Sequence, residues 1–487
     1  MKVNLAGFNF DFNQIKNFSS TIHKLNNCEK LKEQFDKIHF TPESIAAAYA
    51  RISRSKKPVD ILRQDALVEI SKSRKSNREI VFEMGHSSIA EHSIFNFDVI
   101  GISRYLTEFV QKSRLVSYTE KSQRYVTLKG DFVIPNEIEN NSEASKKFRQ
   151  IIEKQNQAYF TLCDCLEKFY NLQYNSKKAK KIQKKKIETK AKEDARYIIS
   201  LATKTQFGMT INARNVEKLL KRLYAINLNE ANALADKIYN NVKTISPSLI
   251  RYTKPSEFDK KRYSTLSENK IEKIKNEIIS FPENCDEKIL TTLIFRENGN
   301  QWKSIFSNVV KMSFEEKKIK FLRYLDGIKS FDSLPREFEI GEFIFQLNIS
   351  ASCFAQLKRH RMSTIISSDY SPENCKHTIP ESIVKCGKKK LFENVINETE
   401  FFYFWLKKHY PQIKNYILTN SHNRGVLFKF NLRELCHFSR LREDSHSQWE
   451  IRKIANEIVS ECRKIAPLST MLICGKDKFE QFYKKYL

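Results

Sequence analysis

The stretches INARNVEKLL (residues 211–220) and FNLRELCHFS (residues 430–439) are two copies of one pattern, and they decide how the chain is organised. Aligning them pairs Asn212 with Asn431 and Arg214 with Arg433. Each copy precedes a series of apolar residues, Leu234, Ala235, Ile238, Val242 and Ile245 before Pro247, and Ile454, Ala455, Ile458, Cys462 and Ile465 before Pro467. This spacing lays apolar side chains along one helical face. Two related halves, each with an amphipathic core helix, are therefore predicted.

Upstream, each half has a stretch typical of a strand, IFNFDVIG at residues 94–101 and EFIFQLNIS at residues 342–350. The apolar stretch SASCFAQL, residues 350–357, is also interpreted as strand-like. Strands that alternate irregularly with helices, without a glycine-rich phosphate loop, indicate an α+β fold rather than a doubly wound sheet. We predict two tandem domains, residues 1–262 and 263–487, each a mixed sheet packed with helices.

The composition fits a globular chain outside the membrane. Its 487 residues include 40% hydrophobic and 29% charged residues, and no uncharged apolar run is long enough to span a bilayer. The ten cysteines form no CxxC pair, so reduced thiols are predicted rather than a disulfide or zinc framework. The first residues lack the apolar core and cleavage site of a signal peptide, and a cytoplasmic location is expected.

The formal net charge of +28 suggests an anionic partner. Abundant Lys, Asn and Ile, however, are typical of chains whose surfaces are basic without binding nucleic acid. The densest basic run, residues 175–192, holds nine lysines and no interleaved aromatic residue to stack on bases. We interpret it as a surface insertion, either a solvated helix extension or a disordered segment, and expect neither a nucleic-acid nor a membrane partner.

Candidate chemistry lies in two further stretches, VQKSRLVSYTEKSQRYV (residues 110–126) and QLKRHRMSTIISSDYSP (residues 356–372). The second contains the triplet Arg359–His360–Arg361. Three adjacent basic residues are usually a solvated patch, but guanidinium groups can also grip phosphate or pyrophosphate through paired hydrogen bonds. The first contains Ser122 and Arg124, a hydroxyl and a guanidinium that suit a small phosphate. Each stretch lacks residues that the other one has.

Five motifs, in order along the chain, resemble the flavin-dependent thymidylate synthases. They are GHSSIAEH (85–92), SRLVSYTEKSQRY (113–125), EDARYIISLATKTQFGMTINAR (193–214), RHRMST (359–364) and NLRELCHFSRLREDSHSQWEIR (431–452). The signature of that family runs Arg-His-Arg, then Ser, then Glu, then Ser-x-Arg-Tyr. Single motifs of this length occur by chance, whereas five in this order, spread over both halves, indicate the family.

The resemblance implies the reductive methylation of dUMP to dTMP, with FAD as hydride carrier, NADPH as reductant and methylenetetrahydrofolate as carbon donor. It implies that Arg442 is the catalytic residue that activates the uracil ring. The residues it implies for dUMP are Glu120, Ser122, Gln123, Arg124, Arg196, Gln356 and Arg359. Those it implies for the cofactor are His86, Ser88, Glu91, Arg359, His360, Arg361, Asn212, Arg214, Asn431, Arg433 and His446. No metal is expected, although GHxxxxEH holds two histidines.

The two halves are complementary with respect to this pattern. The first half keeps Glu120, Ser122, Arg124 and Arg196, but has Lys112, Ser113 and Leu223 in place of the Arg–His pair and the activating arginine. The second half keeps Gln356, Arg359 and Arg442, but has Ser367, Asp369 (with one residue fewer) and Asn415 in the other places. Random decay would not sort losses by side of the site. We therefore predict one composite site per chain, and a homodimer that reproduces the four domains of the tetrameric family.

Other interpretations stay open at this point. The same motifs would serve a related pyrimidine-nucleotide methylase or hydroxymethylase, and a decayed scaffold would leave a non-catalytic, basic nucleic-acid-binding protein. Both Asn-x-Arg pairs persist, so spacing does not say which pair contacts flavin, and each asparagine could instead cap a helix. His446 could be an exposed helical residue, and Trp449 is expected in the core.

Overall fold

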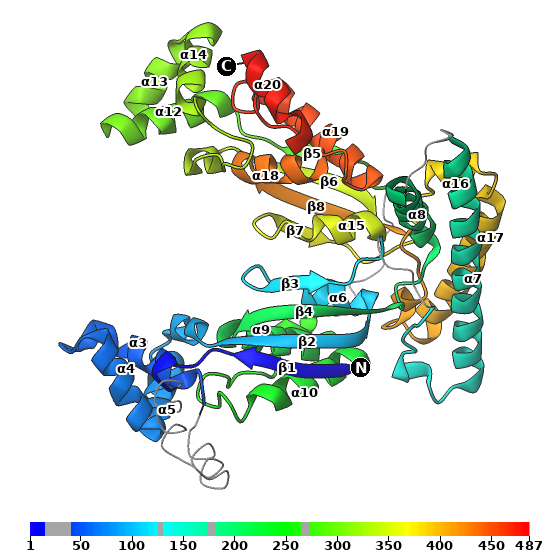
Figure 1. Ribbon diagram of the computed structural model, residues 1–487, viewed down its shortest axis with the longest axis horizontal. Coiled ribbons are helices and arrows are strands. Elements are labelled where there is room, and N and C mark those ends of the chain that lie inside the picture. Colours follow the sequence, from blue (N-terminus) through cyan, green and yellow to red (C-terminus); the bar gives the residue numbers. More distant parts are fainter. Residues whose placement is uncertain (15–39, 125–129, 174–180, 264–272, 487) are drawn as a thin grey trace. The chain divides into compact units, whose positions relative to one another are not determined.

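The computed structural model describes residues 1–14, 40–124, 130–173, 181–263 and 273–486. The chain divides into two compact units. Unit 1 comprises Met1–Gln157, Ile199–Ser267 and Asn397–Leu418, and unit 2 comprises Ala158–Ile198, Glu268–Ile396 and Thr419–Leu487. Each unit thus contains most of one repeat and a shorter segment of the other. The predicted α+β class is confirmed, because each unit has a four-stranded sheet packed with helices (Figure 1).

The sheet of unit 1 has the order β1-β2-β4-β3, and all neighbouring strands are antiparallel. The strands are β1 (Lys2–Phe8), β2 (Ile94–Ser103), β4 (Lys204–Asn212) and β3 (Ser117–Glu120). In β2, Phe95, Phe97 and Val99 are buried and the residues between them are exposed. This alternation buries one face of the sheet. The helices α9 (Ala213–Ala225) and α10 (Asn229–Val242) run along the sheet, and α3 (Glu43–Arg51), α4 (Val59–Val68) and α5 (Ile70–Arg78) gather at one end (Figure 1).

Unit 2 repeats this plan. Its sheet has the order β5-β6-β8-β7, formed by β5 (Glu277–Ser280), β6 (Glu342–Ser350), β8 (Asn423–Asn431) and β7 (Thr364–Ser367). The helices α18 (Leu432–Arg442) and α19 (Trp449–Ile465) cover it, and α12 (Cys285–Asn298), α13 (Trp302–Lys311) and α14 (Phe314–Leu325) lie at one end. The strands predicted at 94–101 and 342–350 and the helices after each Asn-x-Arg motif are confirmed, although Ile245 lies beyond the end of α10.

The interpretation of residues 350–357 as a strand is wrong. They form helix α15 (Ala351–Leu357), whose N-cap is Ser350: the Ser350 hydroxyl accepts a hydrogen bond from the Cys353 amide. Unit 1 has the same arrangement in α6 (Arg104–Val110), capped by Ser103. A serine cap satisfies an amide that the first helical turn leaves without a partner, and this local gain outweighs the apolar character of the stretch.

The boundary between the units falls inside two helices, α7 (Ser142–Gln173) and α17 (Lys389–His409). Helix α8 (Lys181–Ala195) then continues in unit 2 with Ile187 and Ala191 buried. The part of the lysine-rich run from residue 181 onward is therefore helical, while residues 175–180 lie outside the described residues. No helix among the described residues is long and apolar enough to cross a membrane. The division at residues 262 and 263 stays a prediction.

Each unit includes a segment from the other repeat, Asn397–Leu418 in unit 1 and Ala158–Ile198 in unit 2, and we call these the exchanged segments. A buried tyrosine anchors each of them. In unit 1 the Glu230 carboxylate accepts hydrogen bonds from the Ser103 amide and hydroxyl, both at 2.7 Å, and from the Tyr416 hydroxyl at 2.6 Å. In unit 2 Glu450 accepts the equivalent bonds from the Ser350 amide (3.1 Å) and hydroxyl (2.5 Å) and from the Tyr197 hydroxyl. Each tyrosine comes from the other repeat. Both repeats are thus required to satisfy the buried carboxylate of each unit.

These carboxylates give a prediction for the pH dependence of stability. Burial raises the pKa of Glu230 and of Glu450 above the ordinary value of 4.5, against the opposing effect of their hydrogen bonds. A raised pKa contributes stability that is complete below pH 4.5 and lost as the pH rises through the folded-state value. We expect the free energy of unfolding of the native chain, relative to Glu230→Gln/Glu450→Gln, to fall as the pH rises above 4.5. Urea unfolding at several pH values measures it, and a constant difference would contradict the assignment.

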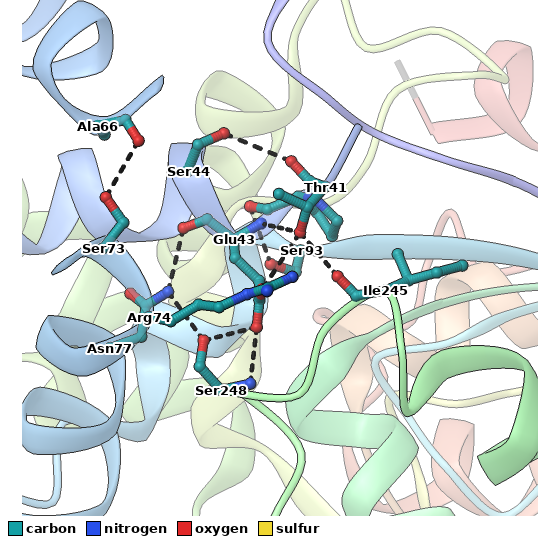
Figure 2. A network of polar contacts seen from close by, with 11 residues as sticks. Thr41, Glu43, Ser44, Ala66, Ser73, Arg74, Asn77, Ser93, Ile245 and Ser248 are labelled. Carbon is teal, nitrogen blue, oxygen red and sulfur yellow. Dashed lines mark hydrogen bonds and ion pairs between the residues drawn. The ribbon is translucent and has the colours of Figure 1, made fainter. Parts of the chain in front are cut away.

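A second buried carboxylate, Glu43, closes the end of unit 1. It accepts hydrogen bonds from the Ser248 amide and hydroxyl, each at 2.6 Å, and from Arg74 Nε at 2.5 Å. Figure 2 shows these bonds together with the contact from Asn77 to the Glu43 carbonyl oxygen. In unit 2, Asp286 accepts from the amides of the corresponding segment, Leu468 at 3.0 Å and Ser469 at 2.8 Å. Both networks tie a helix at one end of a unit, α3 or α12, to the end of a repeat.

Candidate functional site

Unit 2 fixes the side chain of Arg442, the last residue of α18, through three hydrogen bonds. Arg442 donates from Nε to His360 Nε2 at 2.9 Å, from Nη1 to Gln356 Oε1 at 3.2 Å and from Nη2 to the Gln356 carbonyl oxygen at 3.1 Å. Gln356 lies in α15 and His360 in the turn after it. The structure therefore brings Arg442 together with two sequence-predicted residues that lie more than 80 positions earlier in the chain. A guanidinium held in this way presents a fixed positive charge.

The His360 imidazole is turned inward, with 2% of its surface exposed. Its Nδ1 lies 3.3 Å from Glu434 Oε1, and its ring packs edge-on against Phe438 at 4.9 Å. Burial, with the charges of Arg442 and His437, holds the pKa of His360 well below its ordinary value. The sequence assigned His360 to the cofactor together with Arg359 and Arg361. Within this triplet, Arg359 and Arg361 are exposed, whereas His360 is buried.

The structure also places Arg196 in unit 2, although the sequence grouped it with Glu120 and Arg124 of the first half. Arg196 is buried, and its carbonyl oxygen accepts a hydrogen bond from Asn420 at 2.9 Å. Burial raises the pKa of the Cys353 thiol in α15, and the charges of Arg442 and Arg196 oppose this rise. Arg196 therefore lies in the same unit as Arg359 and Arg442.

In unit 1, Glu120 at the end of β3 is held by neighbours that sequence analysis missed. Its carboxylate forms an ion pair with Arg104 at 2.7 Å and accepts hydrogen bonds from Gln111 at 3.0 Å and Thr205 at 3.3 Å. Two residues on, the Ser122 hydroxyl accepts a hydrogen bond from the Arg124 amide at 3.1 Å. Together with Gln123, which is buried, these residues form a polar group that suits the phosphate and sugar of a nucleotide.

The corresponding position of unit 2 is built differently. Ser367 pairs with Val426 in the sheet, as Glu120 pairs with Phe207, and Ala351 stands at the position of Arg104. There the Arg424 guanidinium lies 4.8 Å from the Phe354 ring centre and 4.3 Å from that of Tyr370, and donates from Nε to the Ser368 carbonyl oxygen at 2.9 Å. Unit 2 thus has a serine where unit 1 has a carboxylate, and the neighbouring guanidinium contacts two aromatic rings.

Unit 1 likewise departs from the Arg442 arrangement. Leu223, at the position of Arg442, is completely buried in the core. Arg222, one residue earlier in α9, donates to the Phe109 carbonyl oxygen at 3.2 Å and to the Ser113 hydroxyl at 3.1 Å. Phe109 and Ser113 are the counterparts of Gln356 and His360. An arginine therefore occupies a similar place in the first half, without the glutamine and histidine that fix Arg442.

The two Asn-x-Arg motifs have the same local structure. Asn212 and Asn431 cap α9 and α18, each accepting a backbone amide hydrogen bond at 2.9 Å. Arg214 pairs with Glu91 at 2.5 Å and Arg433 with Glu339 at 3.0 Å. The capping interpretation of the asparagines is confirmed. That one of the two motifs contacts flavin stays a prediction, and their local structure does not distinguish them.

The remaining predicted residues lie on the surface of their own units. His86 and Ser88 are exposed, and so is His446, whose Nδ1 lies 2.9 Å from Asp444. Trp449 is half-buried, stacks on Tyr197 at 5.6 Å and donates to Asp194 at 2.9 Å. Within the described part of the chain, no group of three or more His, Cys, Asp or Glu residues is placed to hold a metal ion.

Comparing the two repeats position by position could have identified Arg104 and Glu434, which the sequence analysis did not name. Arg104 and Glu120 pair in unit 1, and both are replaced in the second half, by Ala351 and Ser367. In unit 2, His360 contacts both Glu434 and Arg442, and all three are replaced in the first half, by Ser113, Asn215 and Leu223. Residues that act together are lost together, so loss in the same repeat predicts contact.

Comparisons with known proteins agree with this architecture. The family model of the thymidylate synthase complementing proteins (Thy1) matches residues 38–248 and 288–468. The flavin-dependent thymidylate synthase of Clostridium tetani is 31% identical over 219 residues, which cover 44% of this chain and 83% of that protein. The UPF0159 protein Ta1429 of Thermoplasma acidophilum is 23% identical over 450 residues, covering 80% of this chain and 86% of that protein. It therefore matches both halves.

Solved structures with some likeness include the UMP/dUMP methylase PolB of Streptomyces cacaoi (14% identity, TM-score 0.33, covering 42% of this chain and 97% of that chain). They also include thymidylate synthase X of Helicobacter pylori with FAD and dUMP (17% identity, TM-score 0.30, covering 54% and 100%). The family match in two segments defines a chain with two synthase-like repeats. The chain belongs to the Thy1 family, that of the flavin-dependent thymidylate synthases.

Proposed function

We propose that the chain converts dUMP to dTMP, with methylenetetrahydrofolate as carbon donor, FAD as hydride carrier and NADPH as reductant. The observation that carries this proposal is the Arg442 guanidinium, held by Gln356 and His360 in a family whose members are flavin-dependent thymidylate synthases. Carbon 5 of uracil becomes nucleophilic only when negative charge can build on the ring. A preorganised positive charge beside the ring stabilises that charge as it develops.

In this proposal the first half holds the nucleotide. Glu120, Ser122, Gln123 and Arg124 bind its sugar and phosphate, and the Arg104 contact keeps the Glu120 carboxylate oriented. Gln356, Arg359 and Arg196 complete the nucleotide site, and Arg442 polarises the uracil. A single active site per chain thus draws residues from both halves. The aromatic-flanked Arg424 of the second half and the buried Leu223 of the first support it, because neither suits a second such site.

The residues present fit a flavin dinucleotide. Arg359 and Arg361 expose two guanidinium groups two residues apart, which is the chemistry that a pyrophosphate requires. We propose that these arginines, with His86, Ser88, Glu91, His446 and one Asn-x-Arg motif, hold FAD. When bound, the flavin supplies the hydride that completes the methyl group, while the protein orients and polarises. We further propose a cytoplasmic homodimer, which would assemble four synthase-like repeats.

Product analysis tests the reaction. The purified chain, supplied with FAD, NADPH and methylenetetrahydrofolate, is expected to form dTMP from dUMP and little methylated product from UMP or dCMP. Chromatography of the nucleotides measures it. Faster methylation of UMP or dCMP than of dUMP would show that dUMP is not the preferred substrate. A chain that stays colourless with added FAD and forms no product would refute a flavin enzyme.

Binding stoichiometry tests the single composite site. Calorimetric titration is expected to give one FAD and one dUMP per chain. Arg124→Ala should weaken dUMP binding at least about tenfold, because the charged hydrogen bonds of a guanidinium to phosphate contribute about 1.5–3 kcal/mol. Asp369→Ala, in the equivalent stretch of the second half, serves as the matched control and should leave dUMP binding unchanged. Two equivalent dUMP sites per chain, or equal losses in both variants, would contradict the proposal.

A further inference from the structure

The orientation of the Arg442 guanidinium depends on His360, which in turn lies close to Glu434. An arginine Nε–H is only a donor, so His360 Nε2, 2.9 Å away, must accept with its lone pair. A neutral imidazole with an accepting Nε2 carries its proton on Nδ1. That nitrogen lies 3.3 Å from Glu434 Oε1, on the opposite side of the ring. The protonated Nδ1 thus lies close to the Glu434 carboxylate. This is an electrostatic contact rather than a hydrogen bond, because Nδ1 makes no hydrogen bond among the described residues.

The surroundings of His360 keep it in this state. It is almost completely buried, and the titratable or charged groups that face it are Arg442 and Glu434 together with His437, whose ring centre is 5.6 Å away. Two of these groups, Arg442 and His437, oppose a positive imidazolium. Glu434 is itself buried, and Ser363, at 3.5 Å, lies beside the same carboxylate oxygen. The tautomer is thus set by packing rather than by solvent.

The first repeat provides an internal comparison. Ser113 stands at the position of His360, Asn215 at that of Glu434 and Leu223 at that of Arg442. Asn215 does not extend toward Ser113, since its Nδ2 donates at 2.8 Å to Asn212 at the helix cap. The half that has Leu223 in place of Arg442 thus also has Ser113 and Asn215 in place of the histidine and the carboxylate. This is expected of residues whose purpose is to hold that arginine.

We propose that His360 and Glu434 are positioning residues, which hold the Arg442 guanidinium in the orientation that the methylation of dUMP requires. The inference rests on the proposed function for its effect on turnover. Its structural part, the acceptance of the Arg442 Nε–H by His360 Nε2 with Nδ1 close to Glu434, does not depend on which substrate is used. It assigns to the central histidine of the Arg359–His360–Arg361 triplet a role different from that of its exposed neighbours.

Kinetics with dUMP test the effect on turnover. His360→Leu removes the acceptor for Arg442 Nε, and kcat is expected to fall about 10- to 100-fold while KM for dUMP changes less than about threefold, since small misplacements of a reacting group reduce rate more than binding. His360→Gln, whose amide oxygen can accept from Arg442, should recover part of the loss. Glu434→Leu should resemble His360→Leu, and the double variant should be no worse than the poorer single one. Ser113→Ala is the matched control, with unchanged kinetics.

Nitrogen NMR of the 15N-histidine-labelled full-length chain tests the structural part. The His360 signals, identified by their absence in His360→Gln, should show a protonated Nδ1 and an unprotonated Nε2 from pH 5.5 to 8. A protonated Nε2 or a titrating ring would overturn the proposal, as would wild-type kcat in His360→Leu. If the native chain forms no dTMP while the Nδ1–H tautomer is observed, the proposed function fails and the positioning of Arg442 stands.

Discussion

Arg442→Ala is expected to lower kcat for dTMP formation about 100- to 1,000-fold, the range found when one preorganised charge-stabilising donor is removed from an active site. The reason is that the guanidinium, fixed at three of its N–H groups, stabilises charge that builds on the uracil only during reaction. Arg442→Lys keeps the charge but loses the planar fork, so it should recover only part of the rate. Steady-state kinetics measure kcat, and far-ultraviolet circular dichroism verifies the fold.

The matched control is Arg222→Ala, which removes the first-half arginine that contacts Phe109 and Ser113. It should retain turnover within about twofold. Leu223→Ala is a poorer control, because Leu223 is fully buried and truncating a buried leucine costs about 2–5 kcal/mol. Equal losses of kcat in Arg222→Ala and Arg442→Ala would contradict the division of labour between the halves, since both arginines would then serve active sites.

Much of the fold could be predicted from local patterns. The strands β2 and β6 and the helices α10 and α19 have clear alternation or helical spacing, because one face of each is buried. The stretch 350–357 could not be assigned in this way. Short apolar runs fit a strand or a buried helix equally well, and the Ser350 cap decides in favour of the helix.

The exchange of segments between repeats had no local signal. Arg196 belongs to unit 2 because the neighbouring Tyr197 is buried against Glu450 and Gln448, residues more than 250 positions away. Such contacts are non-local, and no periodicity in residues 193–198 reports them. Sequence motifs single out Arg442, Gln356 and Glu120 by their identity, and the roles of these residues stay predictions. The site was not predictable where it depends on partners, as for Arg104 and Glu434.

Removing the carboxylates that bind Tyr197 and Tyr416 is expected to reduce the stability of the chain strongly. Glu450→Ala is expected to lower the free energy of unfolding by about 3–5 kcal/mol, because the Ser350 amide, the Ser350 hydroxyl and the Tyr197 hydroxyl would all be left buried without their acceptor. Glu230→Ala should cost a similar amount through Ser103 and Tyr416. Urea unfolding followed by tryptophan fluorescence measures these changes, and Trp449, which stacks on Tyr197, reports directly on unit 2.

Conservative variants separate the hydrogen bonds from simple packing. Glu450→Gln keeps one acceptor oxygen and nearly the same volume, so it should cost less than half as much as Glu450→Ala. Glu461→Ala, on the exposed face of the same helix, is the control and should cost less than about 0.5 kcal/mol. Tyr197→Phe removes only the hydroxyl, and its cost should shrink in the Glu450→Ala background because the two groups form one interaction. Fully additive losses would mean that Tyr197 and Glu450 act independently, and would contradict the assignment of their hydrogen bond as the anchor of this segment.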